Sequence, residues 1–83
     1  MTSLSRKLLP STSALAAFDS VARLGSFSLA ADELSLTQGA ISRQVMSLEE
    51  QLGVRLFERG ARGVSLTGEG QTYARAIGTA LSD

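Results

Sequence analysis

The chain of 83 residues contains no cysteine and no histidine. It therefore has no disulfides, no thiol nucleophile and none of the usual zinc or haem ligands, and it lacks the commonest general base. Packing alone must hold so small a fold, unless a second chain contributes. The lack of cysteine is also consistent with a reducing, cytosolic compartment.

Long apolar runs and net charge are missing as well. No stretch approaches the roughly 20 apolar residues of a membrane span, and the N-terminus has no signal-peptide core. Eight basic residues balance eight acidic ones. This balance argues against a diffuse nucleic-acid binder, but it permits a local basic face because patches act over short range. The adjacent acidic pairs point in different directions on a helix, so they form no catalytic couple, and we expect no enzyme activity.

Apolar spacing and capping residues predict a single small domain after a flexible leader of residues 1–10. Helices are expected at about residues 12–24, 28–34 and 38–52, with the short link between the last two forming a helix-turn-helix. The expected N-caps are Ser11, Thr37 and either Ser26 or Ser28. Gly25 and Gly53 are expected to end the first and third helices.

The spacing of the apolar residues is no longer helical after the third helix. Two short apolar segments flank a tip that contains Gly60, Arg62 and Gly63, which predicts a β-hairpin, or wing. A fourth helix is expected from Thr67 onward, weakened by Gly68, Gly70 and Gly78. It carries an apolar stripe with no obvious partner in the domain. An unpartnered stripe indicates a second subunit. The sequence therefore predicts a homodimer formed through three residues of this stripe: Tyr73, Ile77 and Leu81.

The third helix carries the chemistry that points to function. Its outward side is expected to hold Gln38, Gly39, Ser42, Arg43 and Met46, mostly in the first half of the helix. Glutamine pairs bidentately with adenine and arginine with guanine, and a recognition helix reads bases near its N-terminus. The alternative is a winged-helix domain for protein association, in which this face is only solvated. The two hypotheses differ in whether basic charge gathers at this face and the wing or is cancelled by Glu49, Glu50 and Glu58. The pair Glu49-Glu50 is also expected to pair with arginines such as Arg55.

The sequence from about residue 9 to residue 71 resembles the N-terminal DNA-binding domain of the LysR family of bacterial transcriptional regulators. Five motifs carry the resemblance. The three longest are Ser26-Phe27-Ser28-x-Ala30-Ala31-x-x-Leu34, Leu36-Thr37-Gln38-x-Ala40-Ile41-Ser42-Arg43-Gln44-Val45 and Leu48-Glu49-x-x-Leu52-Gly53-Val54-x-Leu56-Phe57-x-Arg59, and the two shorter ones are Ala14-Leu15-x-x-Phe18 and Arg62-Gly63-x-x-Leu66-Thr67. Leu9-Pro10 and the Ala-Phe-Asp segment are most similar to the glycine-cleavage-activator branch.

The resemblance implies a mainly α fold: a winged helix-turn-helix over residues 11–66 and the start of a dimerisation linker helix over residues 67–83. It implies that Gln38, Gly39, Ser42 and Arg43 enter the major groove of double-stranded DNA. Many members have proline or serine at the position of Gly39, so this chain departs from the family pattern there and the resemblance does not fix the base readout at that position.

The resemblance also implies contacts with the DNA backbone and contacts made by the wing. The residues assigned to these phosphate or wing contacts are Ser28, Thr37, Arg59 and Arg62. The family also implies tetramers, a cytoplasmic, nucleoid-associated location, no cofactor, and a small-molecule co-inducer bound by an effector domain. We expect the chain to be a fragment that lacks this effector domain.

Overall fold

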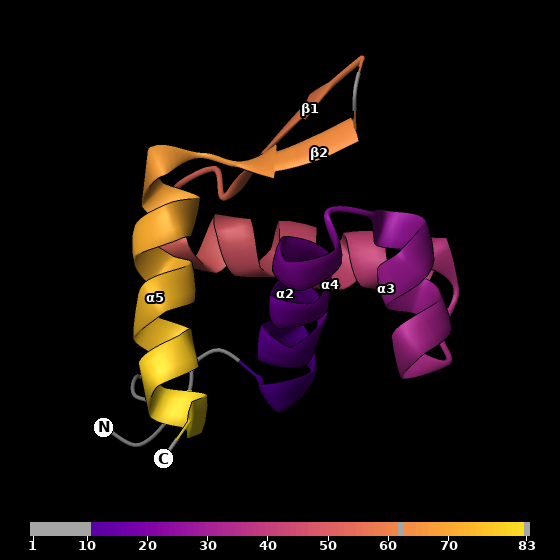
Figure 1. The fold of residues 1–83 in the computed structure, drawn as a ribbon, viewed down its shortest axis with the longest axis horizontal. Helices are drawn as coiled ribbons and strands as arrows, with labels where there is room; N and C mark the ends of the chain where they lie inside the picture. The colour runs from indigo at the N-terminus through magenta and orange to yellow at the C-terminus, as the bar shows by residue number, and fades with distance from the viewer. Residues whose placement is uncertain (1–10, 62, 83) are drawn as a thin grey trace.

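The computed structural model describes residues 11–61 and 63–82, with side chains described as far as Gly78. Its elements are α2 (Thr12–Leu24), α3 (Phe27–Leu34), α4 (Gln38–Leu52), β1 (Phe57–Gly60), β2 (Gly63–Leu66) and α5 (Gly68–Ser82). Three helices, a hairpin and a final helix confirm the predicted winged helix-turn-helix (Figure 1). The expected leader, residues 1–10, lies outside the described residues.

Local signals fix the ends of the first three helices. Their N-cap hydroxyls each accept a hydrogen bond of 3.0 Å from the backbone amide three residues on: Ser11 from Ala14, Ser26 from Leu29 and Thr37 from Ala40. Ser26 rather than Ser28 is therefore the cap of α3, which begins one residue earlier than expected, at Phe27. The helices end at left-handed residues, which are Gly25, Ser35 and Gly53.

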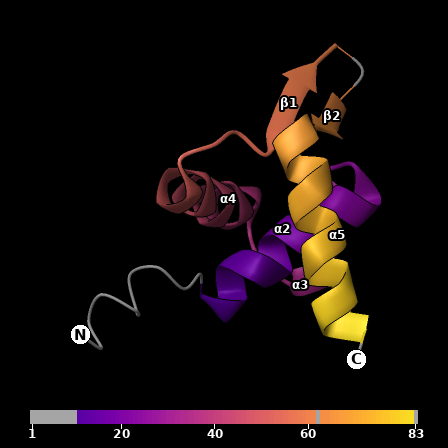
Figure 2. The same cartoon turned by 90° about the vertical axis from the view of Figure 1, so that its left-hand side faces the viewer.

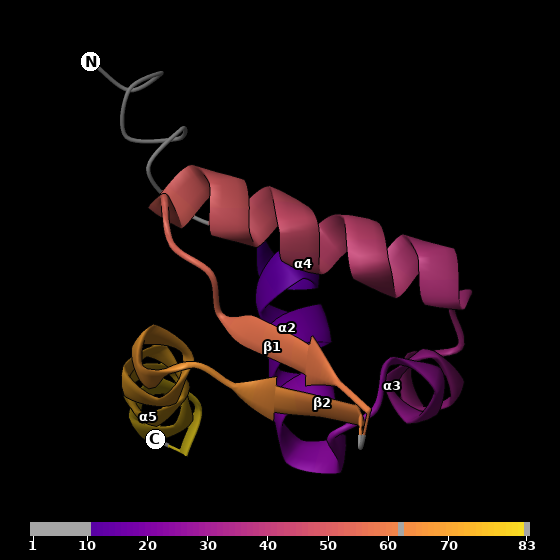
Figure 3. The same cartoon turned by 90° about the horizontal axis from the view of Figure 1, so that it is seen from above.

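The core lies where α2, α3 and α4 meet. Phe18, Val21, Ala30, Ile41 and Leu48 are fully buried there. The two adjacent alanines of α3 bring it close to its neighbours, as their small size predicts. Figure 3 shows α4 along one side of the molecule, with the hairpin running beside it and α5 seen nearly end-on. The hairpin is therefore placed next to the helix that carries the predicted recognition residues.

The hairpin is a two-stranded antiparallel sheet in which Phe57 pairs with Leu66 and Arg59 with Val64. Phe57 is buried, and its ring centroid lies 5.3 Å from that of Phe18 in the core. This contact anchors the base of the wing. Arg62, expected at its tip, lies outside the described residues.

The fourth predicted helix, α5, packs against its own domain. The expectation that its apolar stripe has no partner there is wrong for the described side chains. Ile77 is only 8% exposed, and Tyr73 and Ala74 are half-buried against the same core. The Tyr73 and Phe18 rings meet edge to face with centroids 5.4 Å apart. Figure 2 shows how α5 crosses the α2 side of the core.

Candidate nucleic-acid interface

The first half of α4 presents the side chains that the sequence predicted for the outward side. Gln38, Gly39 and Arg43 are exposed, and Ser42 is half-buried. Farther along the same side, Met46 is 57% exposed. The opposite side of α4 buries its apolar stripe in the core. Because the apolar stripe is buried inside the domain, the polar side of α4 is the side that can contact a partner.

Two residues at the start of α4 bear on how closely a ligand can approach. The Thr37 hydroxyl oxygen accepts the Ala40 amide, so its O–H remains able to donate. A methyl group added at Gly39 would lie 3.9 Å from the Thr37 hydroxyl oxygen, an ordinary contact. The free domain therefore does not require glycine here.

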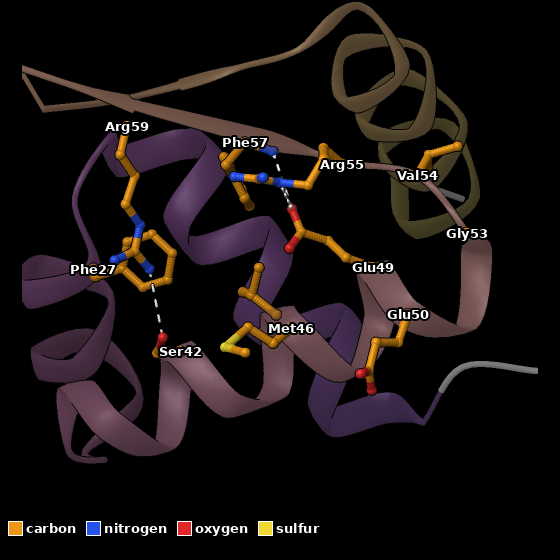
Figure 4. Close-up of a pocket in the computed structure, with 11 residues that line it drawn as sticks. Phe27, Ser42, Met46, Glu49, Glu50, Gly53, Val54, Arg55, Phe57 and Arg59 are labelled. Atoms are coloured by element: carbon orange, nitrogen blue, oxygen red, sulfur yellow. Dashed lines mark hydrogen bonds and ion pairs between the residues drawn. The ribbon is translucent and has the colours of Figure 1, made fainter.

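Arg59 crosses from the hairpin to α4. Its guanidinium carbon lies 4.4 Å from the centroid of the Phe27 ring, and Nη2 donates to Ser42 Oγ at 3.4 Å (Figure 4). Phe27 in turn meets Phe57 edge to face, with ring centroids 6.0 Å apart. A residue predicted for base readout thus touches a residue predicted for the wing.

A hollow of about 550 Å³ lies between the N-terminal ends of α3 and α4 and the hairpin. Five of the predicted site residues line it: Ser28, Gln38, Gly39, Ser42 and Arg59. Thr37 and Arg43 belong to the same face but do not line the hollow. Helix N-termini carry partial positive charge, and Arg59 adds a full one, so this hollow suits an anion such as phosphate.

A second groove, of about 610 Å³, lies between the rest of α4 and β1. Its residues are Phe27, Ser42, Val45, Met46, Glu49, Glu50, Gly53, Val54, Arg55, Phe57 and Arg59 (Figure 4). The sequence did not predict this groove, because it forms only when the hairpin folds back beside α4. Of the residues that line this groove, the helical period had placed Met46 on the outward side of α4.

Glu49 fixes the start of the hairpin relative to α4. Its Oε2 atom accepts hydrogen bonds from the backbone amides of Leu56 at 2.8 Å and Phe57 at 3.3 Å. The expected pairing of Glu49 with Arg55 is present, but at a longer distance of 3.9 Å. The carboxylate is thus directed at the wing backbone and away from the predicted DNA-binding end of α4.

The same short segment also holds the start of α5. The Leu56 carbonyl accepts the Thr67 amide at 3.0 Å, and the Arg55 carbonyl accepts the Thr67 hydroxyl at 2.6 Å. A Cβ atom on Gly70 would lie 2.1 Å from the Leu56 carbonyl oxygen, a distance that real contacts do not reach. Gly70 was expected only to weaken the fourth helix, whereas it permits the close approach of α5 to this segment.

The arrangement bears on the charge question that the sequence left open. Successive residues of a strand point to opposite faces, so Glu58 lies on the face opposite Phe57 and Arg59. Phe57 and Arg59 are directed toward α3 and α4, whereas Glu58 is exposed. Glu49 accepts hydrogen bonds from backbone amides, and Glu58 lies on the other face of the strand. Two of the three acidic residues that could cancel the basic charge are therefore directed away from the predicted DNA-binding face.

The described part of the chain shows neither a metal site nor a membrane-spanning helix. No group of three or more acidic side chains, nor any set with histidine or cysteine, is placed there to hold a metal ion. None of the described helices combines the length and apolar character needed to cross a membrane.

Comparison with known proteins identifies the family. Residues 12–71 match the family described as bacterial regulatory helix-turn-helix proteins of the lysR family. The chain belongs to the LysR family. It is the DNA-binding domain of a LysR-type transcriptional regulator, in a family of regulators rather than enzymes.

Named relatives of this LysR domain include two curated regulators. The regulator TrpI of Pseudomonas aeruginosa is 56% identical over 73 residues, which cover 88% of this chain and 25% of the relative. The glycine cleavage system transcriptional activator of Escherichia coli is 52% identical over 67 residues, which cover 81% of this chain and 22% of the relative. The chain thus spans about a quarter of the length of these relatives.

Solved structures similar to this LysR domain include DNA complexes. The BenM DNA-binding domain bound to its catB site superposes with a TM-score of 0.79 at 42% identity, over 83% of this chain and 78% of that one. The DNA-binding domain of CbnR in complex with DNA superposes with a TM-score of 0.77 at 38% identity, over 83% of this chain and 79% of that one. At these identities the similarity is one of amino-acid sequence as well as of fold.

Proposed function

We propose that this domain binds dyad-symmetric promoter DNA sequence-specifically as a dimer, with α4 in the major groove and the wing at the minor groove. The observation that carries the proposal is the division of α4: its apolar stripe is buried, while Gln38, Gly39 and Arg43 stay exposed in its first half. DNA complexes of the BenM and CbnR domains, which share this fold, support it.

Base readout is assigned to four residues near the start of α4. Gln38 can pair with the N6 and N7 atoms of adenine, and Arg43 with O6 and N7 of guanine. Ser42 donates to a base edge, and Gly39 keeps the backbone close to the groove. Recognition helices use their first turns in this way.

Phosphate contacts are assigned to residues around the hollow between α3, α4 and the hairpin. The Thr37 hydroxyl retains its O–H for donation, and Ser28 is exposed on the first turn of α3. Arg59 brings positive charge to the same hollow. For Arg62 the proposal rests on its place in the wing sequence, from which it would reach the minor groove.

Dimerisation through α5 is a further part of the proposal. Tyr73 lines an open hollow of about 600 Å³ with Leu52, Val54 and Ala76 among its residues. Ile77 is turned into the core of its own domain, and the Leu81 side chain lies outside the described residues. We therefore centre the proposed dimer surface on Tyr73 and its exposed neighbour Ala76.

The dimer surface is tested by sedimentation at several concentrations. Ala76→Glu places a charge on the proposed surface and is expected to weaken self-association. Gln71→Glu, at another exposed position of α5, serves as the control. Equal self-association of both variants and the wild type would remove Ala76 from the interface.

For the whole regulator we propose a tetramer that acts in the cytoplasm at the nucleoid, with a small-molecule co-inducer bound by a separate effector domain. We also propose that the protein is related to the glycine-cleavage-activator branch. The Leu9-Pro10 opening and the 52% identity to that activator support this relationship, although TrpI is 56% identical.

DNA binding is tested by fluorescence polarisation with duplexes selected from a random pool, at two salt concentrations. Wild type is expected to bind in a salt-sensitive manner, because phosphate contacts release counterions. Arg43→Ala and Arg62→Ala are each expected to weaken binding. Arg55→Ala, at the other end of α4, removes the same charge as a control. If no sequence is enriched, the protein-association hypothesis replaces this one.

A further inference from the structure

We propose that Arg59 is a specificity-determining residue that acts through Ser42. By donating to the Ser42 oxygen, Arg59 makes the serine hydroxyl present its hydrogen to the DNA, so that Ser42 selects bases that accept hydrogen bonds. The inference rests on the proposed function, in which the first half of α4 enters the major groove.

The position of Arg59 is set by contacts on two sides. Its guanidinium lies over the Phe27 ring at 4.4 Å, a cation–π contact. Phe27 is supported by the buried Phe57. On the other side, Nη2 reaches Ser42 Oγ at 3.4 Å. Figure 4 shows the guanidinium between the ring and the serine hydroxyl.

The chemistry of the two groups dictates the direction of the hydrogen bond. An arginine side chain has only donors, whereas a serine hydroxyl has one donor and two acceptor lone pairs. Ser42 is therefore the acceptor in this contact, and its own O–H points elsewhere. Among the described residues, no hydrogen bond runs from the Ser42 hydroxyl to a backbone carbonyl, so its hydrogen remains available.

A serine whose oxygen is already engaged discriminates between base edges. In the major groove, O6 and N7 of guanine, N7 of adenine and O4 of thymine accept hydrogen bonds, whereas the amino groups of cytosine and adenine donate them. An unconstrained serine can serve either kind of edge. With Arg59 in place, one of the two lone pairs of Ser42 is occupied while its O–H stays free, so the balance shifts toward base atoms that accept and away from amino groups.

The competing role for Arg59 is a plain phosphate contact through its other N–H donors. That role makes a different prediction. Loss of a phosphate contact weakens binding about equally on all sequences, whereas loss of the Ser42 constraint changes the preference at one base pair. Base preference, rather than affinity, therefore separates the two roles.

The experiment determines binding-site preferences from a random duplex pool for wild type and variants. Ser42→Ala first identifies the base pair at which preference depends on Ser42. Arg59→Met removes every donor but keeps a flexible apolar chain against Phe27. At the identified base pair it is expected to reduce discrimination by about threefold to tenfold, the share of one hydrogen bond.

Three further variants complete the design. Arg59→Met is expected to have no additional effect on preference in the Ser42→Ala background. Arg59→Lys retains a donor and a cation, so it is expected to keep the preference. Arg55→Met removes equal charge from the same groove without a contact to Ser42, and is expected to leave the preference unchanged. Thermal unfolding followed by circular dichroism establishes that each variant is folded.

The outcomes separate this inference from the proposed function. If Arg59→Met lowers affinity uniformly and leaves the preference at the Ser42 base pair intact, Arg59 is a phosphate contact and the inference is overturned. If Ser42→Ala changes no preference, Ser42 does not read a base, and the inference fails while the remaining readout residues stand. If wild type enriches no sequence, the proposed function itself fails.

Discussion

Two polar clusters tie this domain together in contrasting ways. One, the α2–α3 clip, consists of Asp19, Ser20, Arg23 and Glu33. The other, the wing joint, consists of Glu49, Leu56, Thr67 and Gly70. The clip joins side chains to side chains. In the joint, side chains bond to the backbone, and one glycine lets two backbones approach.

The clip lies largely in water. The Arg23 side chain is 52% exposed and that of Glu33 36% exposed, although the Ser20 hydroxyl that donates to Glu33 at 2.7 Å is buried. Exposed ion pairs are screened and contribute little, because water already solvates both charges. The clip connects two helices that also share the apolar core, so packing holds them together without it.

The wing joint is supported by a smaller apolar surface, in which Leu56 and Phe57 are buried in the core. The hairpin contributes only a few buried side chains, and its position beside α4 depends on the amides that Glu49 accepts. The difference indicates that loss of the joint affects both stability and the proposed DNA surface, whereas loss of the clip affects stability alone. Mutations in the two clusters test this difference.

The largest effect is expected from Gly70→Ala. The added Cβ would lie 2.1 Å from the Leu56 carbonyl oxygen, so the start of α5 must move away from the strand. Overpacking costs about 1–3 kcal/mol and occasionally more, and a clash with backbone atoms lies at the upper end of this range or above it, well beyond the less than about 1 kcal/mol gained in helix propensity. Urea unfolding measures the change.

Gly68→Ala is the matched control for Gly70→Ala, because a Cβ at Gly68 meets nothing within 4 Å. It is expected to be close to neutral. Equal stability of the two alanine variants would show that the α5 start shifts at no cost, and the joint would lose its importance relative to the clip.

An intermediate effect is expected from Glu49→Ala, which leaves the amides of Leu56 and Phe57 without their acceptor. Unsatisfied, partly buried amides cost about 1–3 kcal/mol in unfolding free energy. Glu49→Gln keeps an acceptor oxygen and is expected to lose much less. DNA affinity is expected to fall with Glu49→Ala, because the wing is no longer held beside α4.

Arg55→Ala separates the backbone bonds from the ion pair at Glu49. The 3.9 Å contact involves an Arg55 side chain that is 76% exposed, so its loss is expected to stay within about 0.5 kcal/mol. If Arg55→Ala and Glu49→Ala are equally destabilising, the ion pair rather than the amides holds the joint.

The helices and their ends were predictable because their determinants are local. Ser11 and Thr37 cap within one turn, Gly25 and Gly53 end their helices in left-handed geometry, and the outward side of α4 follows from its period. The family match over residues 12–71 supports the same domain.

The wing joint was not predictable because its partners are set by tertiary structure. Glu49 was expected to pair with an arginine, but its shortest bonds go to strand amides that carry no sequence signal. Gly70 looked like a weak helix residue until the strand beside it was placed. The stripe of α5 likewise lacked a partner in the sequence because the contact between Tyr73 and Phe18 spans most of the chain.

The smallest effect is expected from the clip, and it depends on pH. Hydrogen bonds from Arg23, and then from Ser20, hold the pKa of Glu33 below its ordinary value of 4.5. A lowered pKa in the folded state contributes stability above the ordinary value, and this contribution is lost as the pH falls through the folded pKa. Glu33→Gln is therefore expected to be slightly less stable than wild type at neutral pH, with the difference vanishing in acid.

Thermal unfolding of wild type and Glu33→Gln between neutral and acidic pH measures this difference. High salt is expected to reduce it as well, because the charges of the clip are exposed. DNA affinity of Glu33→Gln at neutral pH is expected to equal that of wild type, since the clip touches neither α4 nor the hairpin in its described contacts. A loss of affinity comparable to that of Glu49→Ala would mean that the position of α3 depends on the clip, and the contrast between the two clusters would not hold.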